Sequence, residues 1–112
     1  MAFKIFIDAN VLLDASLKRK KHEAAEELIQ QIYEGNLRAY TTTSVIHITG
    51  HWLTKHYGAE EAKAILLDFL KDINIIDCKH DQVINALNSA MTDIEDALQY
   101  YTALHYKIDF FL

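Results

Sequence analysis

The sequence predicts an α/β fold, a three-layer α/β/α arrangement in which helices cover both faces of a central parallel sheet. Short apolar segments rich in Ile, Phe and Val alternate with segments of helical periodicity along the whole chain. The strand-like segments lack a regular alternation of apolar and polar residues, as is typical of strands buried on both faces. We therefore expect all 112 residues, 1–112, to form one domain with right-handed crossovers between its strands.

The order of elements follows from these patterns. Strands are expected at 3–7, 37–42 and 73–78, with a last strand at or near the C-terminus within 107–112. Helices are expected at 10–17, 22–34, 45–57, 59–71, 81–91 and 93–105. Asn10 is expected to cap the first helix and Thr92 the last one. Helical spacing predicts a buried face for the last helix formed by Ile94, Ala97, Leu98, Tyr101 and Leu104.

Composition limits the classes of function. No apolar run approaches the eighteen or so residues of a membrane span, and the N-terminus lacks a signal-peptide pattern. The single cysteine cannot form an intramolecular disulfide, so the expected location is the cytoplasm, without a membrane contact. The formal net charge of −5 argues against broad, non-specific binding of nucleic acid. A local basic run, Lys18, Arg19, Lys20 and Lys21, could still contact RNA phosphates or form only a solvated turn.

Carboxylates occur at two points where an α/β fold places ligands. Asp8 follows the first apolar strand, and the ends of such strands line the crevice that binds ligands. Asp93 and Asp96 are three residues apart near the start of the last helix, so they lie on one flank, whereas Glu95 is directed more toward solvent. Gathered carboxylates need a compensating cation, and hard oxygen ligands suit Mg²⁺ or Mn²⁺. Early acidic residues also stabilise a helix N-terminus without any ligand, and this simpler role remains open for Asp93 and Asp96.

Two motifs extend this interpretation. The opening Ile5-Phe6-Ile7-Asp8-Ala9-Asn10-Val11-Leu12-Leu13-Asp14 and the late Asp93-Ile94-Glu95-Asp96-Ala97-Leu98-Gln99-Tyr100-Tyr101-Thr102-Ala103 resemble the PIN-domain family, in particular the toxin ribonucleases of the VapC type. The resemblance implies metal-dependent cleavage of RNA, and an antitoxin protein as partner. The family's acids correspond to Asp8 and Asp96, with Asp93 as a further candidate metal ligand. Asn10 matches the polar residue that follows the first acid and joins the candidate catalytic set.

The chain departs from the family pattern at two places. The helix after the second strand carries a Glu in the family, whereas residues 43–53 contain no acid, and His47 or His51 could substitute for it or simply pack. The family pattern continues after the last strand with Thr-x-Asn-x-x-Asp, and this sequence ends before it, so the resemblance is to a C-terminally short member. These departures favour an alternative function, a catalytically impaired scaffold that binds RNA or protein. The apolar end Phe110-Phe111-Leu112 suggests a homodimer formed through the sheet edge.

Two other classes of protein, a phosphatase and a signalling domain, fit the sequence less well. Phosphatases of the haloacid-dehalogenase kind also begin with an apolar strand ending in Asp, but they need a second Asp where this chain has Asn10. A receiver-type signalling domain needs an early acidic pair, which is missing here, although Asp77 follows an apolar strand. If the chain is active, water attacks the phosphodiester directly, because no Ser, Cys or His is placed as an obvious nucleophile.

Overall fold

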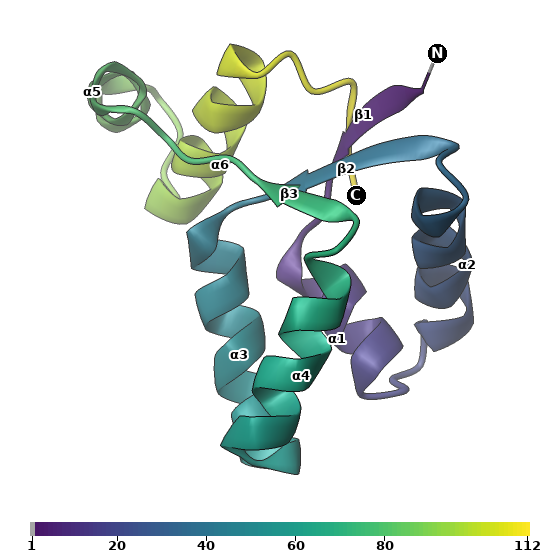
Figure 1. The fold of residues 1–112 in the computed structure, drawn as a ribbon. Helices are drawn as coiled ribbons and strands as arrows, with labels where there is room; N and C mark the ends of the chain where they lie inside the picture. The colour runs from purple at the N-terminus through teal and green to yellow at the C-terminus, as the bar shows by residue number, and fades with distance from the viewer. Residues whose placement is uncertain (1) are drawn as a thin grey trace.

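The computed structural model describes residues 2–112 and contains a parallel sheet of four strands in the order β3-β2-β1-β4 (Figure 1). The strands are β1 (Phe3–Phe6), β2 (Leu37–Thr41), β3 (Ile73–Ile75) and β4 (Phe110–Phe111). Across the sheet, Ile5 of β1 pairs with Ala39 of β2 and with Phe110 of β4, and Ala39 pairs with Ile73 of β3. The predicted parallel α/β fold is confirmed, although β3 and β4 are shorter than the sequence suggested.

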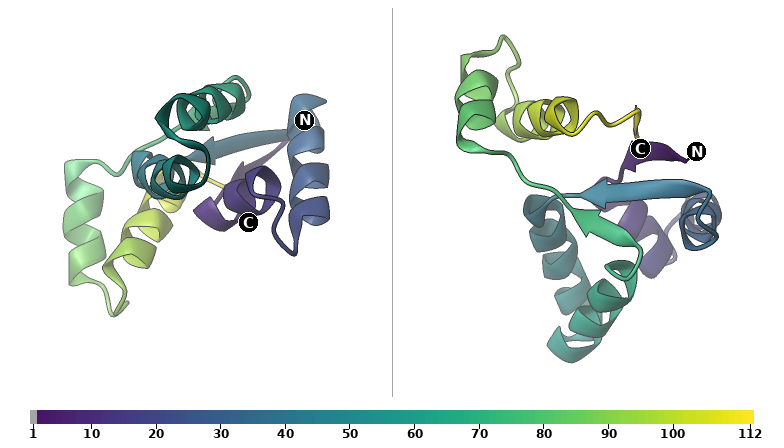
Figure 2. Two further views of the ribbon diagram at one scale, coloured as in Figure 1. Left: turned by 90° about the horizontal axis from the view of Figure 1, so that it is seen from below. Right: turned by 45° about the horizontal axis from the view of Figure 1, so that its top comes forward.

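Helices cover both faces of the sheet. They are α1 (Ala9–Ser16), α2 (His22–Tyr33), α3 (Thr43–Tyr57), α4 (Ala59–Phe69), α5 (His80–Asn88) and α6 (Ile94–His105). The helices α1 to α4 lie on one face, and α5 and α6 lie on the other (Figures 1 and 2). Right-handed crossovers explain this division, because the chain steps from β1 to β2 to β3 in one direction and then returns across β1 to reach β4. No helix among residues 2–112 is long and apolar enough to cross a membrane.

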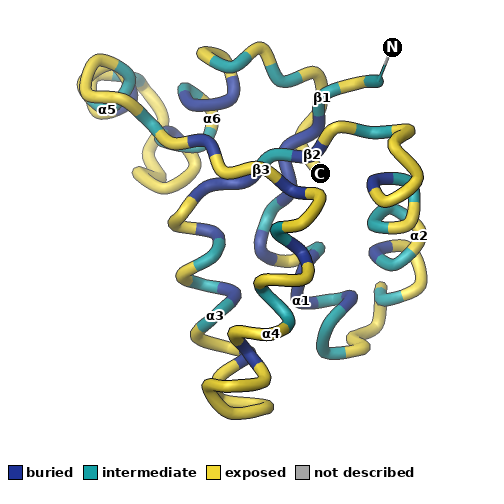
Figure 3. Tube along the Cα trace, in the orientation of Figure 1, coloured by how far each residue is buried: buried dark blue, intermediate teal, exposed yellow. Residues whose placement is uncertain are grey.

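The core lies between the sheet and α1 to α4. Its largest fully buried side chains include Ile5 and Phe6 of β1, Leu12 of α1 and Leu53 of α3. Buried positions therefore concentrate on β1 and on the inner sides of α1 and α3 (Figure 3). This packing fixes the end of β1, and with it the backbone that carries Asp8.

Two predicted helix caps are wrong. The helix α1 begins one residue earlier than expected, so Asp8 holds the N-cap position without a side-chain capping bond, and Asn10 lies inside the first turn. At α6 the cap is Asp93 instead of Thr92, because the Asp93 carboxylate accepts a hydrogen bond from the backbone N–H of Asp96 at 2.9 Å. In both cases the chain turns into the helix at an Asp, whose short polar side chain suits the position.

The predicted buried face of α6 is only partly correct. Ala97 is buried and Leu98 and Tyr101 are half-buried, but Ile94 and Leu104 are 62% and 55% exposed. The other buried residues of α6 are Thr102 and Ala103. The helices α5 and α6 pack chiefly against each other. The buried residues of α6 have small side chains, and its large apolar residues lie outside this buried surface. Helical periodicity identified the helix but not its rotation.

Candidate functional site

The candidate site lies where the direction of the sheet reverses. The strand β1 is flanked by β2 on one side and by β4, reached last, on the other. In open α/β sheets such a reversal opens a crevice at the carboxyl ends of the strands, where ligands bind. Asp8 stands at this point, since its backbone N–H donates to the carbonyl of Leu112 at 3.0 Å and the N–H of Leu112 donates to Phe6 at 2.9 Å. The end of β4 therefore lies directly beside the first candidate acid.

Asp8 and Asp96 line one pocket, which we call the carboxylate pocket. It has a volume of about 430 Å³ and is completed by Met91, Gln99, Tyr100, Phe111 and Leu112. Asp8 enters it from the loop after β1, and Asp96 enters from the first turn of α6 on the opposite face of the sheet. The structure thus brings together Asp8 and Asp96, the two candidate acids that are farthest apart in the sequence.

Asp93 has a different position. One of its carboxylate oxygens caps α6 by accepting from the N–H of Asp96, and its side chain does not line the carboxylate pocket. The cap holds the turn that carries Asp96, so Asp93 acts on the pocket through Asp96 in this arrangement. Its predicted role as a metal ligand stays a prediction.

The donor set of the carboxylate pocket fits a hard divalent cation. Asp8, Asp96 and the side-chain oxygen of Gln99 are oxygen donors, and no thiol or imidazole lines the pocket. Within residues 2–112 no group of three or more His, Cys, Asp or Glu side chains is arranged to hold a metal ion. Mg²⁺ is commonly held by only one or two carboxylates, with water and substrate phosphates completing its coordination. Two carboxylates are therefore compatible with such an ion, although they form a sparser set than the sequence suggested.

A second pocket meets the first at Asp8, and we call it the Trp52 pocket. It has a volume of about 550 Å³ and is lined by Asp8, Ala9, Asn10, Leu13, Leu17, Arg19, Ile48, Trp52 and Glu95. Asn10 lies between its two charged neighbours, with its amide nitrogen 3.4 Å from a carboxylate oxygen of Asp8 and its amide oxygen 3.5 Å from a guanidinium nitrogen of Arg19. These are long, weak contacts, but they link the predicted polar residue Asn10 to the predicted acid.

The basic run divides into residues with different surroundings. Lys18 forms an ion pair with Glu26 of α2, and its hydrogen bond holds the pKa of the Glu26 carboxyl below its usual value. Arg19 forms an ion pair with Asp14 of α1, with 2.9 Å between Nε and Oδ1. Only Arg19 of the four basic residues lines a pocket together with Asp8. Contact of Lys18, Arg19, Lys20 and Lys21 with RNA stays a prediction.

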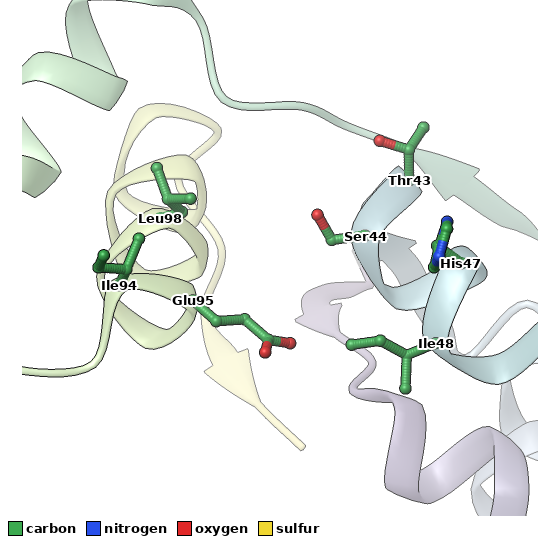
Figure 4. Close-up of a pocket in the computed structure, with 7 residues that line it drawn as sticks. All are labelled: Thr43, Ser44, His47, Ile48, Ile94, Glu95 and Leu98. Atoms are coloured by element: carbon green, nitrogen blue, oxygen red, sulfur yellow. The ribbon is translucent and has the colours of Figure 1, made fainter. Parts of the chain in front are cut away.

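Glu95 is a pocket residue that the sequence did not reveal. Glu95 is exposed, as expected, but its side chain extends from α6 across the cleft toward Ile48 of α3 (Figure 4). It lines a pocket of about 610 Å³ with Thr43, Ser44, His47, Ile48, Ile94 and Leu98, and it also borders the Trp52 pocket. The rotation of α6 about its axis decides this direction, and no signal in the sequence gives that rotation.

The two histidines considered as substitutes for the absent Glu lie near this cleft without reaching Asp8. His47 lines the pocket with Glu95, and the ring of His51 meets Trp52 edge-on, with 5.3 Å between ring centroids. Neither lines a pocket that contains Asp8. The packed or solvated role is therefore the one that their surroundings favour.

Comparison with known proteins places this geometry in a family. The fold is similar to that of VapC20 from Mycobacterium tuberculosis, described as a toxin that cleaves the sarcin–ricin loop, with a TM-score of 0.69, 16% identity, and coverage of 93% of this chain and 84% of that one. It is also similar to VapBC2 from Rickettsia felis, solved with a fragment of promoter DNA, with a TM-score of 0.67, 14% identity, and coverage of 96% and 86%. No curated protein matches by sequence. The model of the PIN domain matches residues 4–112, and the chain therefore belongs to the PIN-domain family.

Proposed function

We propose that this protein is a metal-dependent ribonuclease that hydrolyses phosphodiester bonds of RNA. The observation that carries the proposal is the meeting of Asp8 and Asp96 in one pocket at the reversal point of a PIN-domain sheet. The similar fold of a toxin described as cleaving the sarcin–ricin loop supports RNA as the substrate class. The oxygen donors of the pocket support Mg²⁺ or Mn²⁺ as the cofactor.

The residues of the two pockets would divide the work. Asp8 and Asp96 would hold the divalent ion, which would supply positive charge beside the phosphoryl group and favour ionisation of the attacking water. Asn10 would orient the Asp8 carboxylate through its amide nitrogen, and Asp93 would fix Asp96 by capping α6. Hydrolysis forms one bond from a water oxygen to phosphorus and breaks one ester P–O bond. Among the described residues, no Ser, Cys or His lines either pocket that contains Asp8, which disfavours a covalent protein intermediate.

The test is cleavage of a mixed-sequence RNA by the protein and by Asp8→Asn and Asp96→Asn, with Mn²⁺, with Mg²⁺ and with excess chelator. We expect each variant to lose more activity than the roughly 10- to 100-fold caused by losing an outer partner of a metal ligand. The matched control is Asp72→Asn, because Asp72 lies at the turn before β3 and lines neither pocket. Circular dichroism would establish that all three variants fold. Metal-independent cleavage, or full activity in Asp8→Asn, would refute the proposal.

A catalytically impaired scaffold is the second candidate, favoured by one observation. The described residues hold no cluster of three acids, whereas family members gather a larger set, and α3 supplies no carboxylate to either pocket containing Asp8. A wild-type protein that binds RNA or a protein without cleaving any RNA, at every metal concentration tested, would establish this function and exclude the enzyme.

The likeness to VapC and VapBC structures further supports a toxin that is held by an antitoxin protein. The proposal predicts that induction of the wild-type chain slows the growth of a bacterial host. Asp8→Asn should be harmless at the same protein level, and co-expression of the cognate antitoxin should restore growth. Equal growth inhibition by wild type and Asp8→Asn would show that toxicity, if present, does not come from cleavage.

A further inference from the structure

We propose that the Trp52 pocket is a subsite for one unpaired nucleotide of an RNA, with Trp52 stacking on the base and Arg19 contacting a phosphate. This inference deepens the proposed function and rests on it for the identity of the substrate. It assigns a role to Trp52, an exposed aromatic residue that the active-site acids leave unexplained. It also selects Arg19 from the four residues of the basic run.

The pocket offers an apolar surface that suits a base and hydrogen-bond donors that suit a phosphate. Leu13, Leu17 and Ile48 provide an apolar lining, and Arg19 and Asn10 provide hydrogen-bond donors beside it. Its volume of about 550 Å³ lies within the range of pockets that bind small molecules. An aromatic face for the base and a cation for the phosphate are the usual components of single-strand recognition.

Trp52 is presented in a form that suits stacking. The residue is 49% exposed although it lines a pocket, so a large part of the indole is open to a ligand. Lys55, one helical turn later, places its ammonium 5.3 Å from the ring centroid, and the ring of His51 lies edge-on to the indole. The ammonium adds positive charge beside the position proposed for the base.

Arg19 is held in place before any ligand arrives. Its Nε pairs with Asp14, whose side chain is only 15% exposed, and its backbone N–H donates to the carbonyl of Asp14 at 3.1 Å. The preceding Lys18 takes a left-handed conformation, with φ of 54°, which folds the chain back against α1. Nε is engaged by Asp14 and one terminal nitrogen makes only a long, 3.5 Å contact with Asn10, so terminal N–H donors of the guanidinium remain for a phosphate and less freedom is lost on binding.

The position of the pocket fixes where this nucleotide lies relative to the reaction. Asp8 belongs to both pockets, so a nucleotide stacked on Trp52 neighbours the phosphodiester held at the carboxylate pocket. A base in a continuous duplex is stacked and paired, and cannot lie against the indole. The inferred substrate is therefore a single-stranded segment, a loop or a bulge.

The test uses the fact that Trp52 is the only tryptophan in the sequence, so fluorescence excited selectively in the indole, and not in the six tyrosines, reports on this pocket. A single-stranded RNA of eight nucleotides would be titrated into Asp96→Asn, which blocks cleavage at a residue outside the Trp52 pocket. We expect saturable quenching of the fluorescence by the single strand and little change with the same RNA annealed to its complement. Equal quenching by strand and duplex, or none with either while another method detects binding, would overturn the inference.

Variants in the same background separate the two contacts. For Trp52→Leu, binding measured by anisotropy of a labelled RNA should weaken about 5- to 150-fold, the usual effect of losing one stacked base, and Trp52→Phe should retain most of the affinity. Arg19→Ala should also weaken binding and lower the slope of log affinity against log salt by about 0.7, the value for one lost phosphate contact on a single strand. The matched control is Arg38→Ala, since Arg38 is the only other arginine and lies near the start of β2, away from both pockets.

The outcomes distinguish this inference from the proposed function. If Asp8→Asn abolishes cleavage but Trp52→Leu and Arg19→Ala bind RNA like wild type, the subsite is refuted and the ribonuclease stands. If single-stranded RNA quenches Trp52 and both variants weaken binding, yet no condition yields cleavage, the subsite stands and the ribonuclease is refuted. Quenching by a peptide or protein partner, with none by RNA, would assign the pocket to a protein instead.

Discussion

Asp93 offers a test that separates a helix cap from a metal ligand. Its carboxylate accepts the N–H of Asp96 at 2.9 Å, which is the geometry of an N-cap, and the sequence motif also nominates it as a ligand. Asparagine caps a helix about as well as aspartate but carries no charge, whereas alanine removes both the cap and the charge. Asp93→Asn and Asp93→Ala therefore remove the two properties separately.

The magnitudes follow from this contact. Asp93→Ala should lower the free energy of unfolding by about 1 kcal/mol, within the range of about 0.5–2 kcal/mol for lost caps. Asp93→Asn should lose only the attraction between the charge and the N-terminus of α6, about 0.3–1 kcal/mol at an exposed site. For a chain of this size, 1 kcal/mol corresponds to a shift in Tm of about 4 °C. Thermal unfolding followed by circular dichroism resolves such differences.

RNA cleavage by the same two variants provides a second test. If Asp93 acts through the cap, Asp93→Asn should cleave RNA within a few-fold of wild type, because the turn that holds Asp96 is retained. Asp93→Ala should lose more activity than Asp93→Asn, in step with its loss of stability. A folded Asp93→Asn that is as inactive as Asp96→Asn would refute this reasoning and show that the negative charge of Asp93 is required at the metal.

Three further predictions concern other parts of the molecule. Partial burial, together with the hydrogen bond that the Tyr33 hydroxyl donates to Asp68, raises the pKa of Tyr33. The stability linked to this shift is therefore present below about pH 10 and is lost as the pH rises through the raised pKa. In urea unfolding, Tyr33→Phe should lose less stability than wild type over this pH range. Leu53→Ala removes a fully buried side chain from the core and should cost about 2–5 kcal/mol by the same measurement, with exposed Leu67→Ala as its control at less than about 0.5 kcal/mol. The predicted homodimer would form through β4, where Phe110 is 52% exposed at the sheet edge. Light scattering should then find a dimer for wild type and a monomer for Phe110→Asp, and a monomeric wild type would contradict the predicted homodimer.

The sequence predicted the order of strands and helices because local patterns carry that information. The apolar run before Asp8 and the periodic apolar positions of 22–34 are visible without tertiary contacts, and both elements form where expected. The meeting of Asp8 and Asp96 was also predictable, from the positions where an α/β fold places ligands and from the resemblance to a family, although no local pattern relates residues so far apart. Capping by Asp93 instead of Thr92 was not predicted, because both residue types are good caps and the sequence does not state where the helix begins.

Other features depend on how α6 is held against the sheet, which no local pattern contains. The C-terminal end of α6 is tied to β1, since Lys4 donates from Nζ to the carbonyl of Tyr106. The backbone N–H of Lys4 also donates to the Asp109 carboxylate, and the N–H of Asp109 donates to the carbonyl of Lys4. Within residues 2–112 no hydrogen bond joins the first turn of α6 to the sheet, and α5 is the main packing neighbour of the helix as a whole. The rotation set in this way turns Glu95 into the cleft toward α3, the helix that lacks the family's acid.

Glu95 thus places a carboxylate in the Trp52 pocket, to which α3 contributes none. It borders the Trp52 pocket with Asp8 but does not line the carboxylate pocket, so under the proposed function it would lie beside the nucleotide subsite and not beside the metal. A carboxylate beside a phosphate backbone opposes binding, and Arg19 on the same pocket offsets that charge. If the proposed subsite is correct, Glu95→Gln should therefore strengthen RNA binding and Arg19→Ala should weaken it, because the net charge of −5 already opposes a phosphate backbone.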